Sequence, residues 1–357
     1  MTHEQSYEAI DNFPNRVGMN FEIGSTTIEP GTRKQVSFKV GLLPQGNDLT
    51  ITVNVVHGAN DGKVLGLLST THGAEFLSIE QIRQVVLGID PGQLSGTILA
   101  VPMANPLAFQ HKTTNTPGDE LNMNRYFPGK PLGAQQTGSY IGGLTETMAY
   151  VISEQLIQKS DCLLDFHLGP WGQAILCIDR PVTTGPLSSE VDQLARLTRV
   201  KIIHDWDMPG GTSIKYALSL NKPGIGIEIG GGGFGEVWER KWLASAEQGV
   251  LNIMKHMGML RGEQSPPTKQ ILLGGRAGLW PCNGGYHIPL VTPDLLGEEV
   301  KKDQPLGYTF NPQTLEVVDE MKSPYEGLLY SIRARGPIAL GEWSYLVGEK
   351  SKAKWLS

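Results

Sequence analysis

An alternation of apolar runs and helical patterns between residues 63 and 260 constrains the fold more than any other feature of the sequence. The apolar runs are short and continuous, as buried strands are, and several are separated by segments with the period of an amphipathic helix. This alternation predicts an α/β domain with a mixed, largely parallel sheet flanked by helices. The expected strands are 63–71, 96–105, 161–168, 173–178, 200–206 and 224–230, and the expected helices are 75–88, 144–157, 188–199, 212–220 and 236–260.

The segments on either side of this alternation are predicted to be β-structure. Before it, residues 34–40 and 49–56 alternate apolar and polar side chains, as half-buried strands do. After it, the polar stretch 261–270 contains Pro266 and Pro267 and indicates a linker. The remaining residues form short β-like runs with Gly and Pro turns, which favour a small all-β barrel or sandwich. The sequence thus predicts one domain at 1–262 and a second at 270–357.

Charge and composition exclude several classes of function. The net charge of the 357-residue chain is −6 and no cluster of Lys and Arg is present, so no nucleic-acid partner is expected. No apolar run reaches the roughly 18 residues that a membrane span needs, and the polar N-terminus does not resemble a signal peptide. Three scattered cysteines offer no disulfide framework, which favours a reducing compartment. We therefore expect a cytoplasmic protein without a membrane partner.

Polar side chains follow or end several of the expected strands. His72 comes directly after the strand 63–71 and Asn105 ends the strand 96–105, while His167 and Glu228 lie near the ends of theirs. In open α/β sheets, ligands bind outside the carboxyl ends of the strands. These four side chains therefore point to a functional site at one edge of the sheet.

The stretch "STTHGAEF" places His72 and Glu75 three residues apart, directly after a buried strand. Catalytic zinc takes three protein ligands, commonly His nitrogens and a carboxylate oxygen, and keeps one position for water. His167 in "DFHLG" is the best candidate for the third ligand, and Asp165 points the same way along the strand, where it could orient His167. The alternative is a polar turn with a capping glutamate, and the spacing alone leaves both interpretations open.

Two further features accompany these residues. Asn124 and Arg125, in the long loop from Asn105 to Gly129, offer a fork suited to a substrate carboxylate. The alternative is that Arg125 pairs with an acidic residue of its own loop. Glu228 lies in an otherwise apolar strand, where a carboxylate is costly to bury without a partner or a task. Beside a metal, Glu228 would act as general base and then general acid; otherwise it would form a structural salt bridge.

Taken together, these motifs resemble those of the succinylglutamate desuccinylase/aspartoacylase family, relatives of the zinc carboxypeptidases (M14-like). "HGAE", "NPLAF…DELNMNRYFPG", "DFHLG" and "GIEIGGGG" occur in the order seen in that family, and the similarity covers nearly the whole chain. The resemblance implies a zinc carboxypeptidase-like α/β domain. It also implies that residues 270–357 form the family's appended β-domain, an all-β half-barrel of lipoyl type that narrows the mouth of the active site.

The resemblance further implies a zinc-dependent amidohydrolase, a deacylase that removes an N-acyl group from a small amino acid or related amine. One Zn²⁺ per subunit would be held by His72, Glu75 and His167. Glu228 would activate water at the metal. Asn124 and Arg125 would anchor the carboxylate of a small N-acylated substrate. A homodimer is expected because it is the commonest oligomer of soluble enzymes.

One position departs from the family pattern. An arginine that polarises the scissile carbonyl is usual in the loop before the Asn-Arg pair, and Thr114 stands there in this chain. Either a neighbouring cation such as His111 or Lys112 substitutes, or zinc alone polarises the carbonyl, or the substrate has shifted to an ester or activated amide, or catalysis is weak. The loop residues Thr114, His111 and Asp119 thus join Asn124 and Arg125 as substrate-binding candidates.

Two alternative functions use the same residues. A metallocarboxypeptidase acting on short peptides would remove a C-terminal amino acid rather than an acyl group. A catalytically weak, metal-containing ligand-binding protein would keep the metal site without turnover, and Thr114 is the feature that favours it.

Overall fold

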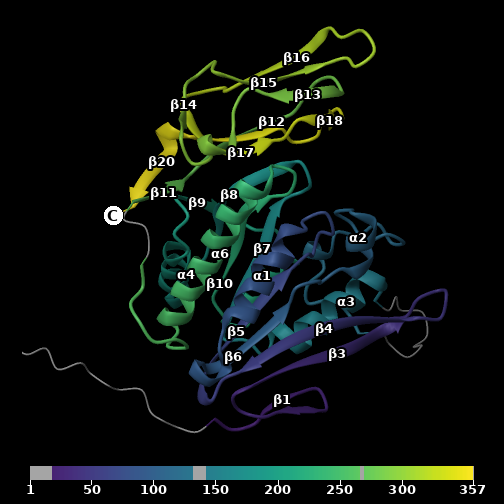
Figure 1. Ribbon diagram of the computed structural model, residues 1–357, viewed down its shortest axis with the longest axis vertical. Coiled ribbons are helices and arrows are strands. Elements are labelled where there is room, and N and C mark those ends of the chain that lie inside the picture. The colour runs from purple at the N-terminus through teal and green to yellow at the C-terminus, as the bar shows by residue number, and fades with distance from the viewer. Residues whose placement is uncertain (1–17, 132–141, 266–268, 357) are drawn as a thin grey trace, which may run out of the picture.

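The computed structural model describes residues 18–131, 142–265 and 269–356, and its centre is a mixed sheet of fourteen strands (Figure 1). Four adjacent parallel strands form the middle of the sheet, in the order β6–β5–β7–β10. Antiparallel β4 and β3 extend it beyond β6, and antiparallel β8 extends it beyond β10. The predicted mixed α/β sheet flanked by helices is confirmed, and its parallel part lies in the middle, where the strand-end polar residues are. The bounds are β3 Thr32–Leu42, β4 Asp48–His57, β5 Asn60–Ser69, β6 Ser95–Val101, β7 Cys162–Gly169, β8 Gln173–Pro181, β9 Ile202–Trp206 and β10 Gly224–Gly231.

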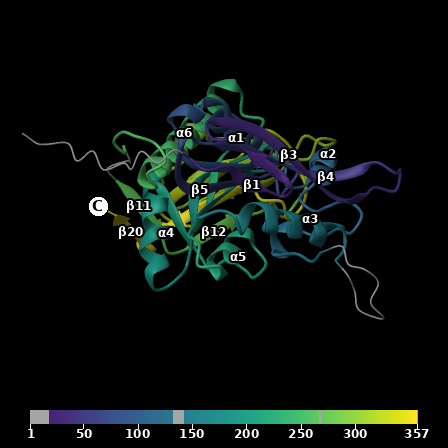
Figure 2. The ribbon, with the colours of Figure 1, turned by 90° about the horizontal axis from the view of Figure 1, so that it is seen from below.

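Helices cover both faces of this sheet. Figure 2 shows α1 and α6 on one side and α3 and α5 on the other, and α4 packs with α6. Each face buries its own apolar core, because the middle strands present apolar side chains in both directions. Thr212 begins α5 as predicted, its hydroxyl accepting a hydrogen bond from Lys215 N at 3.2 Å. The bounds are α1 Leu77–Gly88, α2 Pro106–His111, α3 Leu144–Ile152, α4 Pro186–Leu197, α5 Ser213–Ser219 and α6 Glu236–His256.

Two predicted elements differ from the structure. The stretch 106–138, expected to be irregular, begins with the helix α2, which Asn105 caps by accepting a hydrogen bond from Ala108 N. Asn105 followed by Pro106 is a helix-start signal, because proline is favoured at the first helical position after an Asn cap. The helix expected over 144–157 ends at Ile152, where a π-turn over Ser153–Ile157 replaces the α-helical ladder. The end of the irregular stretch (132–138), the N-terminal segment and the Pro266-Pro267 pair lie outside the described residues.

The smaller antiparallel β region predicted after the linker is also present. Within it, Tyr345 joins two sheets: its hydroxyl donates to Leu306 O at 2.8 Å and lies 2.8 Å from His287 Nε2. The bounds are β11 Gln270–Leu273, β12 Arg276–Leu279, β13 Gly285–Pro289, β14 Glu299–Val300, β15 Pro305–Phe310, β16 Val317–Lys322, β17 Gly327–Arg333, β18 Gly336–Ile338, β19 Tyr345–Glu349 and β20 Ala353–Leu356, and a separate N-terminal hairpin pairs β1 Phe21–Ile23 with β2 Thr26–Ile28.

This β region is hydrogen-bonded to the main sheet. β17 pairs antiparallel with β8, and β11 pairs parallel with β9. β19 pairs with the other side of β17, and β12 pairs with β19. The strands of residues 270–356 therefore continue the sheet that carries the strand-end polar residues, and the division into two domains stays a prediction. Across residues 18–131, 142–265 and 269–356, no helix has the length and apolar character needed to cross a membrane.

Candidate metal centre and cavity

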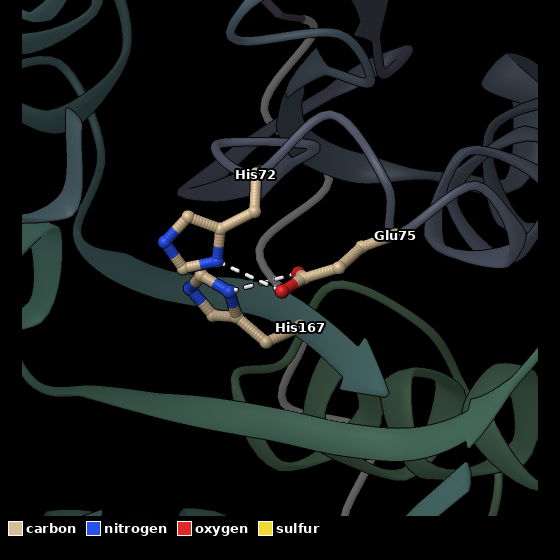
Figure 3. Close-up of side chains that lie close together, drawn as sticks. All are labelled: His72, Glu75 and His167. Atoms are coloured by element: carbon tan, nitrogen blue, oxygen red, sulfur yellow. Dashed lines mark hydrogen bonds and ion pairs between the residues drawn. The ribbon is translucent and has the colours of Figure 1, made fainter. Parts of the chain in front are cut away.

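The loop between β5 and α1 brings His72 and Glu75 to the end of the parallel strands, where His167 arrives on β7 (Figure 3). A Cβ on Gly73 would lie 1.9 Å from the carbonyl carbon of Ala108, so only glycine lets this loop pack against the backbone of α2. His72 and Glu75 come from the loop that follows β5, and His167 comes from β7, the parallel neighbour of β5. Their convergence is a direct result of the parallel arrangement.

The three side chains present their nitrogen and oxygen atoms to one another. His72 Nδ1 lies 2.8 Å from Glu75 Oε1, and His167 Nδ1 lies 3.1 Å from Glu75 Oε2 (Figure 3). Each residue offers one nitrogen or oxygen atom to a metal, and these three atoms lie within 4.8 Å of one another. Two imidazole nitrogens and a carboxylate are a donor set that catalytic zinc uses, so these residues fit a zinc ion.

The charges in this group suit a cation. Burial raises the pKa of Glu75, but His72 and His167 outweigh that effect and bring it to about 2. Burial lowers the pKa of His167, but Asp165 and Glu75 outweigh it and hold that pKa well above its usual value. Glu75 is therefore ionised at neutral pH, and His167 has to give up a proton when a metal binds.

Two further residues contact the outward ring nitrogens of the histidines. His72 Nε2 lies 3.1 Å from Asn122 Oδ1, and His167 Nε2 lies 3.1 Å from Asp165 Oδ2. Ser213 in turn donates a hydrogen bond to Asp165. A histidine that holds a metal commonly donates its other N–H to such a partner, which sets its tautomer. Sequence reasoning singled out Asp165 but missed Asn122, whose place in "NMNR" beside Asn124 was the available signal.

Glu228 faces the three residues from the next strand. It is the register partner of His167, and both line a cavity of about 320 Å³. Burial, followed by the negative charge of Asp179, holds the pKa of Glu228 well above its usual range. A carboxylate with a raised pKa beside a candidate metal centre is suited to accepting and returning a proton.

Asn124 and Arg125 also line this cavity. Asn124 Oδ1 accepts a hydrogen bond from Ser213 N at 3.1 Å, and Asn124 Nδ2 lies 3.2 Å from His167 Nε2. Arg125 donates to the backbone oxygen of Asn124 at 2.6 Å and forms no ion pair with the described carboxylates. The sequence alternative, in which Arg125 orders its own loop by pairing with an acidic neighbour, is not seen.

The rest of the cavity lining comes from segments that sequence reasoning did not connect to the site. Asp179 and Trp206 belong to β8 and β9, whereas Arg276 and Trp343 belong to the C-terminal β region. Asp179 directly follows the apolar run 174–178, which is a weaker signal than that of Glu228, with apolar residues on both sides. Arg276 and Trp343 had no comparable signal.

Three of the predicted substrate-binding residues lie away from this cavity. Thr114 is exposed and lines a separate hollow beside Phe109. His111 is exposed at the last residue of α2. Asp119 accepts hydrogen bonds from the backbone N–H of Thr145, at 2.9 Å, and from its hydroxyl, at 2.8 Å. The structure therefore brings together the metal candidates, Glu228, Asn124 and Arg125, but not these three.

Asp119 is expected to contribute to stability rather than to substrate binding. Asp119→Ala removes both hydrogen bonds to the start of α3, and we expect the free energy of unfolding to fall by about 2 kcal/mol. Activity per folded molecule should not change. Denaturant unfolding measures the first quantity, and Glu120→Ala, next along the exposed loop, is the control. An Asp119→Ala protein of full stability but impaired activity would contradict the structural role.

One family model, one relative by sequence and two solved structures show what this chain is similar to. Residues 61–257 match the sequence model of the succinylglutamate desuccinylase/aspartoacylase catalytic domain. An N-alpha-acetyl-L-2,4-diaminobutyric acid deacetylase of Halomonas elongata is 25% identical over 323 residues, covering 86% of this chain and 90% of that protein. A succinylglutamate desuccinylase from Silicibacter sp. TM1040 has a similar fold, with a TM-score of 0.75 at 21% identity, covering 89% of this chain and 94% of the other. The product-bound ectoine utilization protein EutE from Ruegeria pomeroyi also reaches 0.75, at 20% identity, covering 89% and 95%.

Proposed function

The chain belongs to the succinylglutamate desuccinylase/aspartoacylase family, and from this premise we propose that it is a zinc-dependent amidohydrolase that removes an N-acyl group from a small amino acid or related amine. The observation that carries the proposal is the convergence of His72, Glu75 and His167, with Glu228 opposite them in the same cavity. A zinc ion held there would polarise the acyl carbonyl and lower the pKa of water.

In this proposal, Glu228 moves the protons of the reaction. Its carboxylate takes a proton from the attacking water and returns it to the nitrogen of the leaving amine. The raised pKa favours this task, because a carboxylate that holds a proton more tightly than an ordinary glutamate accepts one from water more readily. Since Glu228 is the register partner of His167, it lies beside the candidate metal ligands without being one of them.

Asn124 and Arg125 bind the carboxylate of the amine half. If Nδ1 of His167 held the metal, the ring hydrogen would be on Nε2 and would be donated to Asp165. The amide Nδ2 of Asn124 would then have no acceptor on that ring and would be available to a substrate oxygen. Arg125, without an ion pair inside the described chain, supplies the charge. Together they would hold the substrate in attack geometry.

The size of the cavity favours small substrates. Its volume of about 320 Å³ is at the low end for ligand sites, and Trp343 and Arg276 from the β region close one side of it. This restriction favours an N-acyl amino acid over a peptide. One zinc ion per chain, a homodimer and a cytoplasmic location stay predictions of the sequence.

The test is hydrolysis of a panel of N-acyl amino acids by the purified, zinc-loaded protein, with zinc content measured alongside. The panel should include N-alpha-acetyl-L-2,4-diaminobutyric acid, on which the Halomonas elongata relative is named to act. Release of free acid and amine supports the proposal. Release of a C-terminal residue from blocked dipeptides would instead support a carboxypeptidase, and ligand binding without turnover a non-catalytic protein.

A further inference from the structure

Asp179 is a nearly buried carboxylate in the cavity that the proposed reaction does not use. Asp179 is 7% exposed and lies on β8. It follows Cys177 by two positions, and Cys177 is the register partner of Glu228 on β10. Its own partner on β10 is Gly226, where a Cβ would lie 3.1 Å from the Asp179 Cβ. The cavity floor therefore runs from His167 through Glu228 to Asp179 across three adjacent strands.

The hydrogen bonds of Asp179 leave one oxygen without a donor in the described parts of the chain. His204 Nδ1 lies 2.8 Å from Oδ1, and the Cys177 thiol is directed to the same oxygen at 3.9 Å. No described donor reaches Oδ2. Oδ2 is not among the fully buried oxygens, so it is open to the cavity, and the charge of Asp179 opposes ionisation of Glu228. A cation bound at this oxygen would neutralise that charge.

The position of the leaving amine decides which part of a substrate faces Asp179. Arg125 would hold the carboxylate of the amine half, and Glu228 would protonate its nitrogen. The remaining substituent of that half then extends beyond Glu228, where Asp179 lies. The rings of Trp206 and Trp343 line the same cavity, and aromatic faces attract cations.

We propose that Asp179 is a specificity-determining residue that binds a positively charged side chain on the amine half, so that the substrates are N-acylated diamino acids. This inference rests on the proposed deacylase function. It is carried by the nearly buried carboxylate with one oxygen open to the cavity, by its place on the strand next to that of Glu228, and by the two tryptophans that line the same cavity.

Arg276 is the charged group that competes with this assignment. Its guanidinium is close enough to interact electrostatically with Asp179 and Tyr330, but it forms no ion pair with any described carboxylate. Arg276 is exposed, on a short strand of the β region, whereas Asp179 lies in the floor. If Arg276 dominated the recognition, the protein would prefer an anionic side chain, as in an N-acyl aspartate.

The experiment compares three N-acetyl amino acids that differ in side-chain charge: 2,4-diaminobutyrate, its neutral isostere norvaline, and aspartate. For the wild-type protein we expect kcat/KM to be about 10- to 100-fold higher for the cationic substrate than for the neutral one, the range for a hydrogen bond to a charged group. Asp179→Asn should bring this ratio near one, chiefly through KM for the cationic substrate. For the neutral substrate, kcat/KM should change by less than about threefold, measured at a pH where the rate does not depend on pH.

The control is Asp205→Asn, which removes a carboxylate on β9, next to His204, that pairs with Arg180. It should leave the substrate preference unchanged. A wild-type preference for norvaline or aspartate derivatives, or an Asp179→Asn protein that keeps the cationic preference, would overturn the assignment while leaving the deacylase function intact.

A binding measurement answers the question without turnover. Free 2,4-diaminobutyrate should raise the Tm of the zinc-loaded wild type more than norvaline does, and Asp179→Asn should abolish that difference. If no substrate is hydrolysed yet this difference is present, the proposed function fails and the cation site stands. Equal shifts for both amino acids would refute the site.

Discussion

Replacing Glu228 by glutamine is expected to lower kcat for an N-acyl amino acid by about 10³-fold, within the range that a positioned general acid–base contributes. Glutamine has nearly the same shape but neither accepts a proton from water nor returns one to the leaving nitrogen. KM and zinc content should change little, because Glu228 faces the candidate ligands without contributing a ligand atom. Steady-state kinetics with metal analysis on the same sample measure all three quantities.

The pH dependence provides an independent check on Glu228. The base works in its ionised form, so kcat/KM should fall as the pH drops through the pKa of Glu228. Burial and the charge of Asp179 raise that pKa, and the decline should therefore begin at a higher pH than for an ordinary glutamate. Asp179→Asn removes a like charge and should move the decline of kcat/KM to lower pH. Glu190→Gln, which alters a half-buried carboxylate beside His256, away from the cavity, is the control. A Glu228→Gln enzyme with more than a tenth of wild-type kcat would exclude the assigned role.

Replacing His167 by alanine is expected to abolish zinc binding and to lower kcat/KM by more than about 10³-fold, since it removes both the metal's charge and its activation of water. Changing a residue that contacts the ligand, rather than the ligand itself, should have a smaller effect on zinc binding. Asp165→Asn, which alters the partner of the outward ring nitrogen, should weaken zinc binding by about 10- to 100-fold and leave a functional site when zinc is in excess. Competition with a chelator of known affinity measures both effects.

The same measurement has a defined pH dependence. Zinc binds the neutral imidazole, and the pKa of His167 is raised in the metal-free protein by Asp165 and Glu75. Zinc affinity should therefore rise with pH up to that raised pKa, with proton release on binding. His57→Ala is a suitable control, because His57 is buried elsewhere, 2.9 Å from Thr97 Oγ1. Full zinc binding by His167→Ala would show that the metal lies elsewhere.

The central fold and the metal candidates could be predicted because their signals are local. Apolar runs separated by helical patterns predict parallel strands, and parallel strands bring residues at their carboxyl ends together, so His72 and His167 could be paired across the sequence. Asp119 shows the limit of such reasoning. A carboxylate in a polar loop looks the same whether it binds a substrate or, as here, the start of α3, because the sequence does not show which backbone donors fold toward it.

The far wall of the cavity could not be predicted, for a different reason. Trp343 and Arg276 reach the site because β17 pairs with β8 and β12 follows through β19. Pairing between strands so distant in the chain depends on packing of the complete sheet, which periodicity does not encode. Thr114 is the converse case: its place in the loop suggested a site residue, but it is exposed outside the cavity.

The way the β region joins the main sheet has a consequence for biosynthesis. One side of β8 pairs with β10, and the other is shared between β9 and β17, while β11 covers the free side of β9. On the ribosome, residues 18–265 emerge before β11 and β17 exist, so unpaired backbone groups of β8 and β9 are exposed at that stage. The part that holds the candidate metal centre thus depends on later residues to cover an exposed sheet edge, and such an edge is prone to aggregation until those residues have been synthesised.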